Sequence, residues 1–246
     1  MKNLIQNTLE CVEAKGTITQ FFIRDDDAGW AMDRLEVLVA KTLQLELPLD
    51  LAVIPMALHS KNEQSLRHMA GSAPELLGLH QHGYAHHNHQ ESGRFCEFGS
   101  DRDLHQQRED IQRGAARLRS AFGDSVDSIF TPPWNRCGQN TADLLVTENF
   151  EYLSRDTTAV AFDKSRLQER AIAIDWLKKR NRVRLSKPAF TEYCCQQINT
   201  NRHVGIMLHH EMMDDNEVQS FGEFVSALSR SPNTLFTRIS KLRPEL

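Results

Sequence analysis

Residues 77–89 read LGLHQHGYAHHNH and place five of the chain's eleven histidines between residues 80 and 89. A neutral imidazole offers one lone pair that suits zinc, iron, nickel or cobalt. His82 and His86 are four residues apart, so one helical turn or tight loop can point both the same way, and the glycine between them lets the backbone bend around an ion. Such a run on its own is equally consistent with a solvated loop or with imidazoles bonded in a core. Residues elsewhere in the chain are needed to distinguish a metal site from these alternatives.

Composition limits the class of protein. With 246 residues the chain is long enough for one large α/β domain, and we expect a single catalytic domain over 1–246 with a core at about 17–230. Its net charge of -4, with acids and bases mixed, gives no basic patch, so neither nucleic acid nor a membrane is an expected partner. The N-terminus is polar where an export signal is apolar, which favours the cytoplasm. Five cysteines without a C-x-x-C pair indicate reduced thiols.

Apolar runs rich in β-branched residues alternate with amphipathic segments along the chain, which is typical of parallel strands joined by helices. Strands are predicted at 17–23, 48–55, 76–80, 128–130, 152–154, 171–176 and 204–208. Helices are predicted at 4–15, 32–45, 62–70, 103–122, 141–149, 190–199 and 217–228. The basic segment 178–184 is expected to be solvated.

The sequence RDDD at residues 24–27 directly follows the first predicted strand. Three adjacent carboxylates repel one another, so Arg24, a metal ion or both should lie beside them. Short acidic clusters are often turns or helix caps, but in α/β barrels catalytic groups gather at this end of the strands. Two later strands also end in polar residues, namely Asp175 followed by Trp176, and the pair His209 and His210.

The segment TPPWNR at residues 131–136 follows the fourth predicted strand. Its two prolines form a rigid corner, and Trp134 offers a flat apolar wall. Arg136 is suited to bind or orient an anion. An ordinary surface loop is the alternative interpretation.

In this order, these residues resemble the motifs of the polysaccharide deacetylase superfamily, the NodB-homology or carbohydrate esterase family 4 group. The resemblance runs from about residue 21 to residue 211 and implies a deformed (β/α) barrel of the glycoside hydrolase/deacetylase type. The family motifs fall on Asp26-Asp27, on His82 and His86, on Pro132-Pro133-Trp134, on Asp175-Trp176, and on Leu208 with His209 or His210.

The resemblance implies that Asp27, His82 and His86 hold a divalent ion, with Zn²⁺ first and Co²⁺, Mn²⁺ or Ni²⁺ as alternatives. It makes Asp26 the general base and the late histidine the general acid. Asp175 would orient and charge-balance that histidine. The residues expected to line the substrate pocket are Tyr84, whose N–H could contact an oxyanion, Pro133 and Trp134.

Three departures from the family pattern leave alternatives open. The acidic triplet could be read as Asp25-Asp26, although Ala28 in the place of the family's glycine favours Asp26-Asp27. Thr131 stands where the family has an arginine, so Arg136 is expected to supply that charge. Because alternate residues on a strand face opposite ways, only one of the two late histidines can face the site, and the apolar run before His209 favours it over His210.

The expected function is a metal-dependent hydrolase that removes an acyl group, most simply acetyl, from an N-acylated sugar or related small molecule. One alternative is hydrolysis of another non-peptide C–N bond, in a cyclic amide or ureide, on the same fold. Another is a non-catalytic carbohydrate- or metal-binding homologue, although a carboxylate next to the ligand set argues for chemistry. The sequence does not indicate an oligomeric state.

Overall fold

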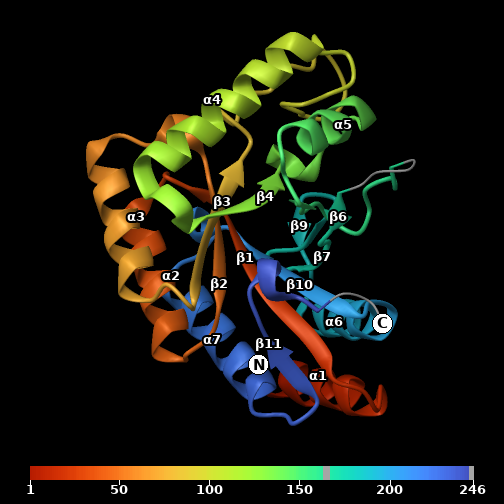
Figure 1. The fold of residues 1–246 in the computed structure, drawn as a ribbon. Helices are drawn as coiled ribbons and strands as arrows, with labels where there is room; N and C mark the ends of the chain where they lie inside the picture. Colours follow the sequence, from red (N-terminus) through yellow and green to blue (C-terminus); the bar gives the residue numbers. More distant parts are fainter. Residues whose placement is uncertain (163–166, 244–246) are drawn as a thin grey trace.

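The structure is a computed structural model that describes residues 1–162 and 167–243, so the expected domain over 1–246 includes a few residues outside the described part. Its main sheet has the strand order β6-β5-β4-β3-β2-β1-β10-β7, with β11 beside β1, and neighbouring strands are parallel (Figure 1). The strands are β1 (Thr19–Ala28), β2 (Leu49–Val53), β3 (Leu77–His82), β4 (Val126–Thr131), β5 (Tyr152–Leu153), β6 (Gln168–Glu169), β7 (Ile172–Asp175), β10 (His203–Leu208) and β11 (Thr234–Phe236).

The sheet curls until its two sides meet. Asp156, just after β5, forms a parallel bridge with Ile172 of β7. The N–H of Ile172 donates to the carbonyl of Arg155 at 2.7 Å, and the N–H of Thr157 donates to that of Ile172 at 2.9 Å. The result is a deformed (β/α) barrel, as the motifs predicted.

Seven α-helices of the described chain surround the sheet (Figure 1). Contacts between neighbouring helices follow the order α5-α4-α3-α2-α7-α1-α6 around the outside. None of the helices in the described part is both long and apolar enough to cross a membrane. The helices are α1 (Lys2–Ala14), α2 (Met32–Gln44), α3 (Ser60–Ser72), α4 (Leu104–Phe122), α5 (Gln139–Thr147), α6 (Lys187–Thr200) and α7 (Asp215–Ser229), with short 3-10 turns at Pro55–Ala57, Gly123–Ser125, Pro133–Asn135, His210–Met212 and Ile239–Lys241.

Alternation along β1 builds two different cores. Phe21 and Ile23 face outward and pack in the large cluster between sheet and helices. Phe22 faces the barrel interior, where a small apolar cluster lies below the polar residues that follow it on the same face. That inner cluster consists of Phe22, Ile129, Ile172, Met207, Ile239 and Leu242.

The predicted strands are present, with two informative differences. The first strand does not stop at residue 23 but continues through the acids to Ala28, because each carboxylate finds a buried partner. The basic segment 178–184, expected to be solvated, contains a two-stranded hairpin of β8 (Lys179–Arg180) and β9 (Val183–Arg184), whose residues are exposed.

Candidate metal centre and active site

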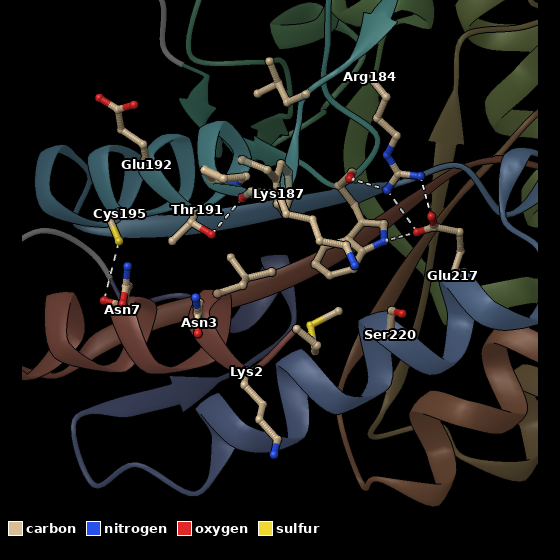
Figure 2. A pocket seen from close by; sticks show the side chains of 16 residues that line it. Lys2, Asn3, Asn7, Arg184, Lys187, Thr191, Glu192, Cys195, Glu217 and Ser220 are labelled. Carbon is tan, nitrogen blue, oxygen red and sulfur yellow. Dashed lines mark hydrogen bonds and ion pairs between the residues drawn. The ribbon is translucent and has the colours of Figure 1, made fainter.

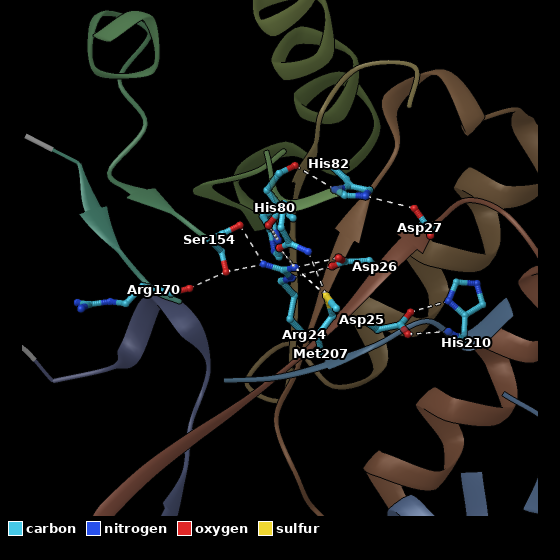
Figure 3. A network of polar contacts seen from close by, with 12 residues as sticks. Arg24, Asp25, Asp26, Asp27, His80, His82, Ser154, Arg170, Met207 and His210 are labelled. Atoms are coloured by element: carbon cyan, nitrogen blue, oxygen red, sulfur yellow. Dashed lines mark hydrogen bonds and ion pairs between the residues drawn. The ribbon is translucent and has the colours of Figure 1, made fainter. Parts of the chain in front are cut away.

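Three consecutive aspartates at the end of strand β1 contact three different partners (Figure 3). These pairs are Asp25 with His210, Asp26 with Arg24, and Asp27 with His82. Asp26 lies on the face of the strand that lines the barrel interior, whereas Asp25 faces the other way and contacts His210. The register with β2 shifts after Asp25, and Asp27 has a left-handed φ of 68°. This irregularity turns the Asp27 carboxylate to the rim of the barrel, toward the histidine run.

Asp27, His82 and His86 bring three ligand atoms together at that rim. Oδ1 of Asp27 lies 3.2 Å from Nε2 of His82 and 3.1 Å from Nε2 of His86. One ligand atom from each residue lies within 4.8 Å of the other two. Atoms bound to one tetrahedral Zn²⁺ lie about 3.3 Å apart. The three residues that the sequence selected therefore fit a single divalent ion.

The backbone around His82 fixes which ring nitrogen faces the other ligands. Nδ1 lies 2.9 Å from the carbonyl oxygen of Thr131, so it carries the proton and leaves the Nε2 lone pair toward Asp27. Burial alone would lower the pKa of His82, but its hydrogen bond to Asp27 and the nearby acids raise that pKa. Burial would likewise raise the pKa of Asp27, yet its bonds to the two imidazoles hold it well below the usual range. A metal ion must compete with these protons.

A buried glutamate holds the loop between the two histidine ligands. The carboxylate of Glu97 accepts hydrogen bonds from the N–H groups of Tyr84 at 3.2 Å and Ala85 at 2.7 Å. Gly83 has a φ of 55°, and a Cβ there would collide with Glu97 and lie 2.6 Å from the ring of Pro133. The expectation that the N–H of Tyr84 contacts an oxyanion is corrected, because that hydrogen is donated to Glu97. Glu97 was not among the residues selected from the sequence, because it lies between a predicted strand and a predicted helix in a stretch without a motif.

Trp134 packs beside the ring of His86. It and Asn135 both have left-handed backbones, with φ of 55° and 58°, a conformation that costs about 1 kcal/mol or more for residues other than glycine. The turn brings the indole to 4.4 Å from the His86 ring, between centroids, while Trp30 lies 5.0 Å from the same ring. Pro133, also expected in the pocket, is buried behind the loop.

Asp26 is held by Arg24, two residues earlier on the same face of β1 (Figure 3). Nε and Nη2 of Arg24 donate to the two carboxylate oxygens at 2.7 and 2.8 Å. The other donors bond the carbonyl and hydroxyl of Ser154 at 2.9 and 2.7 Å and Oδ1 of Asn135 at 2.7 Å. This fully bonded, buried guanidinium balances and orients the carboxylate.

Arg136 does not supply that charge. Its Nη1 donates to the carbonyl oxygen of Phe95 at 3.2 Å, and its side chain lines a separate cavity. The cation beside Asp26 is Arg24, so the expectation for Arg136 is corrected. The Arg24–Asp26 contact could be predicted from the sequence, because residues two apart on a strand have side chains on the same face.

His210 is enclosed and fully bonded. Its Nδ1 lies 2.6 Å from Oδ2 of Asp25, its backbone N–H donates to Oδ1 of Asp25 at 3.0 Å, and its Nε2 lies 2.9 Å from the carbonyl of Trp30. Burial disfavours charge, but the Asp25 carboxylate and these bonds raise the pKa of His210 to about 9. With acceptors at both nitrogens, the ring is a structural cation.

His209 lies at the end of β10 and is partly exposed. Strand β10 lies between β1 and β7, with Leu208 opposite Asp25 and Met207 opposite Asp175, so His209 follows next to the ends of both strands. Its imidazole lowers the pKa values of Asp27 and Asp175. Burial nevertheless raises the pKa of Asp175 overall. Of the two late histidines, His209 is the one available to donate a proton.

Trp176 points away from this site. Its Nε1 donates to Glu217 at 3.1 Å, and its indole lines a cavity of about 840 Å³ between α1, α6 and α7 (Figure 2). Arg184 of the β8–β9 hairpin also binds Glu217 there. The carboxylate of Asp175 accepts a hydrogen bond from the N–H of Leu177 at 2.9 Å, whereas the tryptophan of this motif packs between helices.

The fold matches solved structures, although neither a family model nor a curated protein matches the sequence. A Mycobacterium smegmatis protein assigned as a polysaccharide deacetylase aligns with a TM-score of 0.70 and 14% identity, over 93% of this chain and 96% of that one. A family 4 acetyl xylan esterase from Clostridium thermocellum, in complex with a cobalt ion, aligns at 0.59 and 13%, over 90% and 89%. A CE4 family pseudoenzyme from Bacillus anthracis aligns at 0.60 and 10%, over 90% and 63%.

The chain therefore has the fold of the polysaccharide deacetylases and family 4 carbohydrate esterases, which confirms the resemblance seen in its motifs. Identities of 14%, 13% and 10% are too low for the fold to define the activity. Since these neighbours include both an esterase and a pseudoenzyme, activity must be argued from the residues of this chain.

Proposed function

We propose that this protein is a metal-dependent hydrolase that removes an acyl group, most simply acetyl, from an N-acylated sugar or a related small molecule. The observation that supports it most directly is the convergence of Asp27, His82 and His86 beside a second, separately held carboxylate, Asp26. A site that only bound metal would not need that carboxylate.

The three ligands would hold one divalent ion, and two imidazoles with one carboxylate favour Zn²⁺ over harder ions. When bound, such an ion supplies Lewis-acid polarisation of the acyl carbonyl and makes water a better nucleophile at neutral pH.

The protein's own groups supply the rest of the reaction. Asp26 takes the proton of the attacking water, and Arg24 keeps its carboxylate aimed. His209 gives a proton to the departing nitrogen, with the Asp175 carboxyl at the end of the neighbouring strand β7. Trp134 and Trp30 flank His86 and provide apolar surface against which the acyl group or sugar ring can lie.

A hydrolysis screen tests this proposal. Acetate and ammonia release are measured over a panel of N-acetyl sugars, simple amides and cyclic ureides, with zinc, cobalt and manganese supplied separately. We expect metal-dependent acetate release from at least one N-acetyl sugar, and its loss in Asp26→Asn. Ammonia or ring-opened product without acetate would assign the site to another C–N bond. Metal binding without turnover of any panel member would favour the non-catalytic alternative.

A further inference from the structure

A cavity of about 390 Å³ lies at the rim of the barrel beside the candidate active site. It is lined by the segments that follow β3, β4 and β5, which are adjacent parallel strands. The carboxyl ends of parallel strands meet at one edge, so the cavity opens at the same end of the barrel as the metal ligands.

Direct contacts join this cavity to the site. Asn135 lines it and also accepts a hydrogen bond from Arg24, the partner of the proposed base. Phe95, whose carbonyl binds Arg136, has its ring 5.5 Å from that of Trp134, which in turn lies against a metal ligand. The cavity therefore lies next to the candidate site.

The lining is strongly positive. It contains three arginines, Arg94, Arg136 and Arg155, against one carboxylate, Asp156. Arg155 is already paired with Glu169. Oδ1 of Asp156 is engaged by the N–H and hydroxyl of Thr158, at 2.8 and 2.5 Å.

Arg94 and Arg136 have no ion pair with a carboxylate among residues 1–162 and 167–243. Within the described part of the chain, the Arg136 guanidinium donates a hydrogen bond to a neutral group, the carbonyl of Phe95. Burial and the like charge of Arg94 both lower the pKa of Arg136. With Asp156 as the one carboxylate that lines the cavity beside them, these two guanidiniums form an unfavourable arrangement that an anion would relieve.

We propose that the Arg94–Arg136 cavity binds an anionic substituent of the substrate, a phosphate, sulfate or carboxylate, while the acyl group lies at the metal centre. This inference rests on the proposed function and narrows its substrate class to acidic N-acylated sugars or similar small anions. A guanidinium fork matches such oxygens, and the cavity is large enough for one substituent of this kind.

The test compares matched substrates that differ in one anionic group. N-acetylglucosamine is paired with its 6-phosphate and its 1-phosphate, and with an N-acetylated uronic acid, so that the arms also distinguish the kind of anion. We expect kcat/KM to favour at least one anionic member by about tenfold or more at low ionic strength, and added salt to reduce that preference. Arg94→Gln with Arg136→Gln should bring the ratio close to one.

Arg230→Gln is the matched control for Arg94→Gln and Arg136→Gln made singly, because it removes one positive charge, as each of them does, from the exposed C-terminal end of α7 and should keep the ratio. Thermal melting of each variant establishes that it is folded. Equal kcat/KM for neutral and anionic members, unchanged in the double variant, overturns the inference while deacetylation itself stands.

Calorimetric binding of the same sugars to Asp26→Asn protein separates the two proposals. If no sugar is hydrolysed by the wild type but an anionic one binds through Arg94 and Arg136, the cavity is supported and the proposed function fails. If no anionic sugar binds, or if binding is the same in the double variant, the inference is overturned.

Discussion

Two histidine–carboxylate contacts arise from the same acidic triplet and differ in what surrounds the imidazole. Between His210 and Asp25, Nδ1 lies 2.6 Å from the carboxylate, Nε2 faces the carbonyl of Trp30, and neither side chain of the pair is exposed. Between His82 and Asp27 the distance is 3.2 Å, and the Asp27 side chain remains 12% exposed at the rim.

The difference shows what makes an imidazole a ligand. His210 has acceptors at both nitrogens and keeps no lone pair, so it binds as a cation and holds two strand ends together. His82 uses one nitrogen for a backbone carbonyl and directs the other to a point shared with His86 and Asp27. The same pair of residue types can thus serve structure or chemistry, depending on the second nitrogen.

Removing the ligands should have the largest effect on activity. The double change His82→Ala with His86→Ala is expected to abolish stoichiometric metal binding and to lower turnover on the order of a thousandfold or more. Elemental analysis of purified protein and the acetate-release assay measure the two effects. His210→Gln is the control, which should retain the ion. Unchanged metal content in the double variant would place the metal elsewhere.

The base should be separable from the ligand beside it. Asp26→Asn should keep the metal and lose on the order of a hundredfold in kcat, because the ion's ligands stay intact while proton removal fails. Asp27→Asn should lose metal and activity together. Metal content and kcat are measured on both. Exchanged phenotypes, or metal loss in Asp25→Asn, would show that the roles within the triplet are assigned wrongly.

The loss of kcat/KM on removing His209, the proposed general acid, should be larger for a poorer leaving group. His209→Ala should keep the metal and lower kcat/KM for an amide by roughly ten- to a hundredfold, yet affect an activated ester far less. The ratio of the two losses is the measurement. The same substrates tested on His210→Ala provide the comparison. Equal losses on amide and ester in His209→Ala would exclude the acid role.

The buried Asp25–His210 pair should affect the free energy of unfolding and not the turnover number. The pKa of His210 is raised to about 9, above its unfolded value of about 6.5, so its contribution is fully present below pH 6.5 and is lost as pH rises through about 9. That contribution is at most about 3 kcal/mol. Urea unfolding of chelator-treated protein at pH 6, 7.5 and 9 should show a steeper loss for the wild type than for His210→Gln. Parallel pH profiles would contradict the pairing.

Much of the fold follows from local sequence. The alternation of apolar runs and amphipathic segments predicted the strands and their parallel order, since burial on both faces requires such runs. The three residues that come together at the rim, Asp27, His82 and His86, could also be selected from the sequence, because the His82–His86 spacing and the acid after the first strand are local patterns.

What could not be predicted depends on contacts between distant segments. Where the Arg136 side chain lies depends on how its loop packs against Phe95, and the choice between His209 and His210 depends on what buries each. Glu97 holds the ligand loop from a stretch with no periodic pattern. These features depend on tertiary contacts, which local secondary-structure propensity does not predict.

Strand β1 pairs with β10 and β11 from the far end of the chain, and Asp25 meets a partner 185 positions away. Contacts of such high sequence separation require the loop-closure entropy to be overcome before they stabilise anything, which slows folding. We therefore expect a folding intermediate without β10 to lack His209 and the Asp25–His210 pair, even if Asp27 and His82, which are 55 positions apart, had already come together.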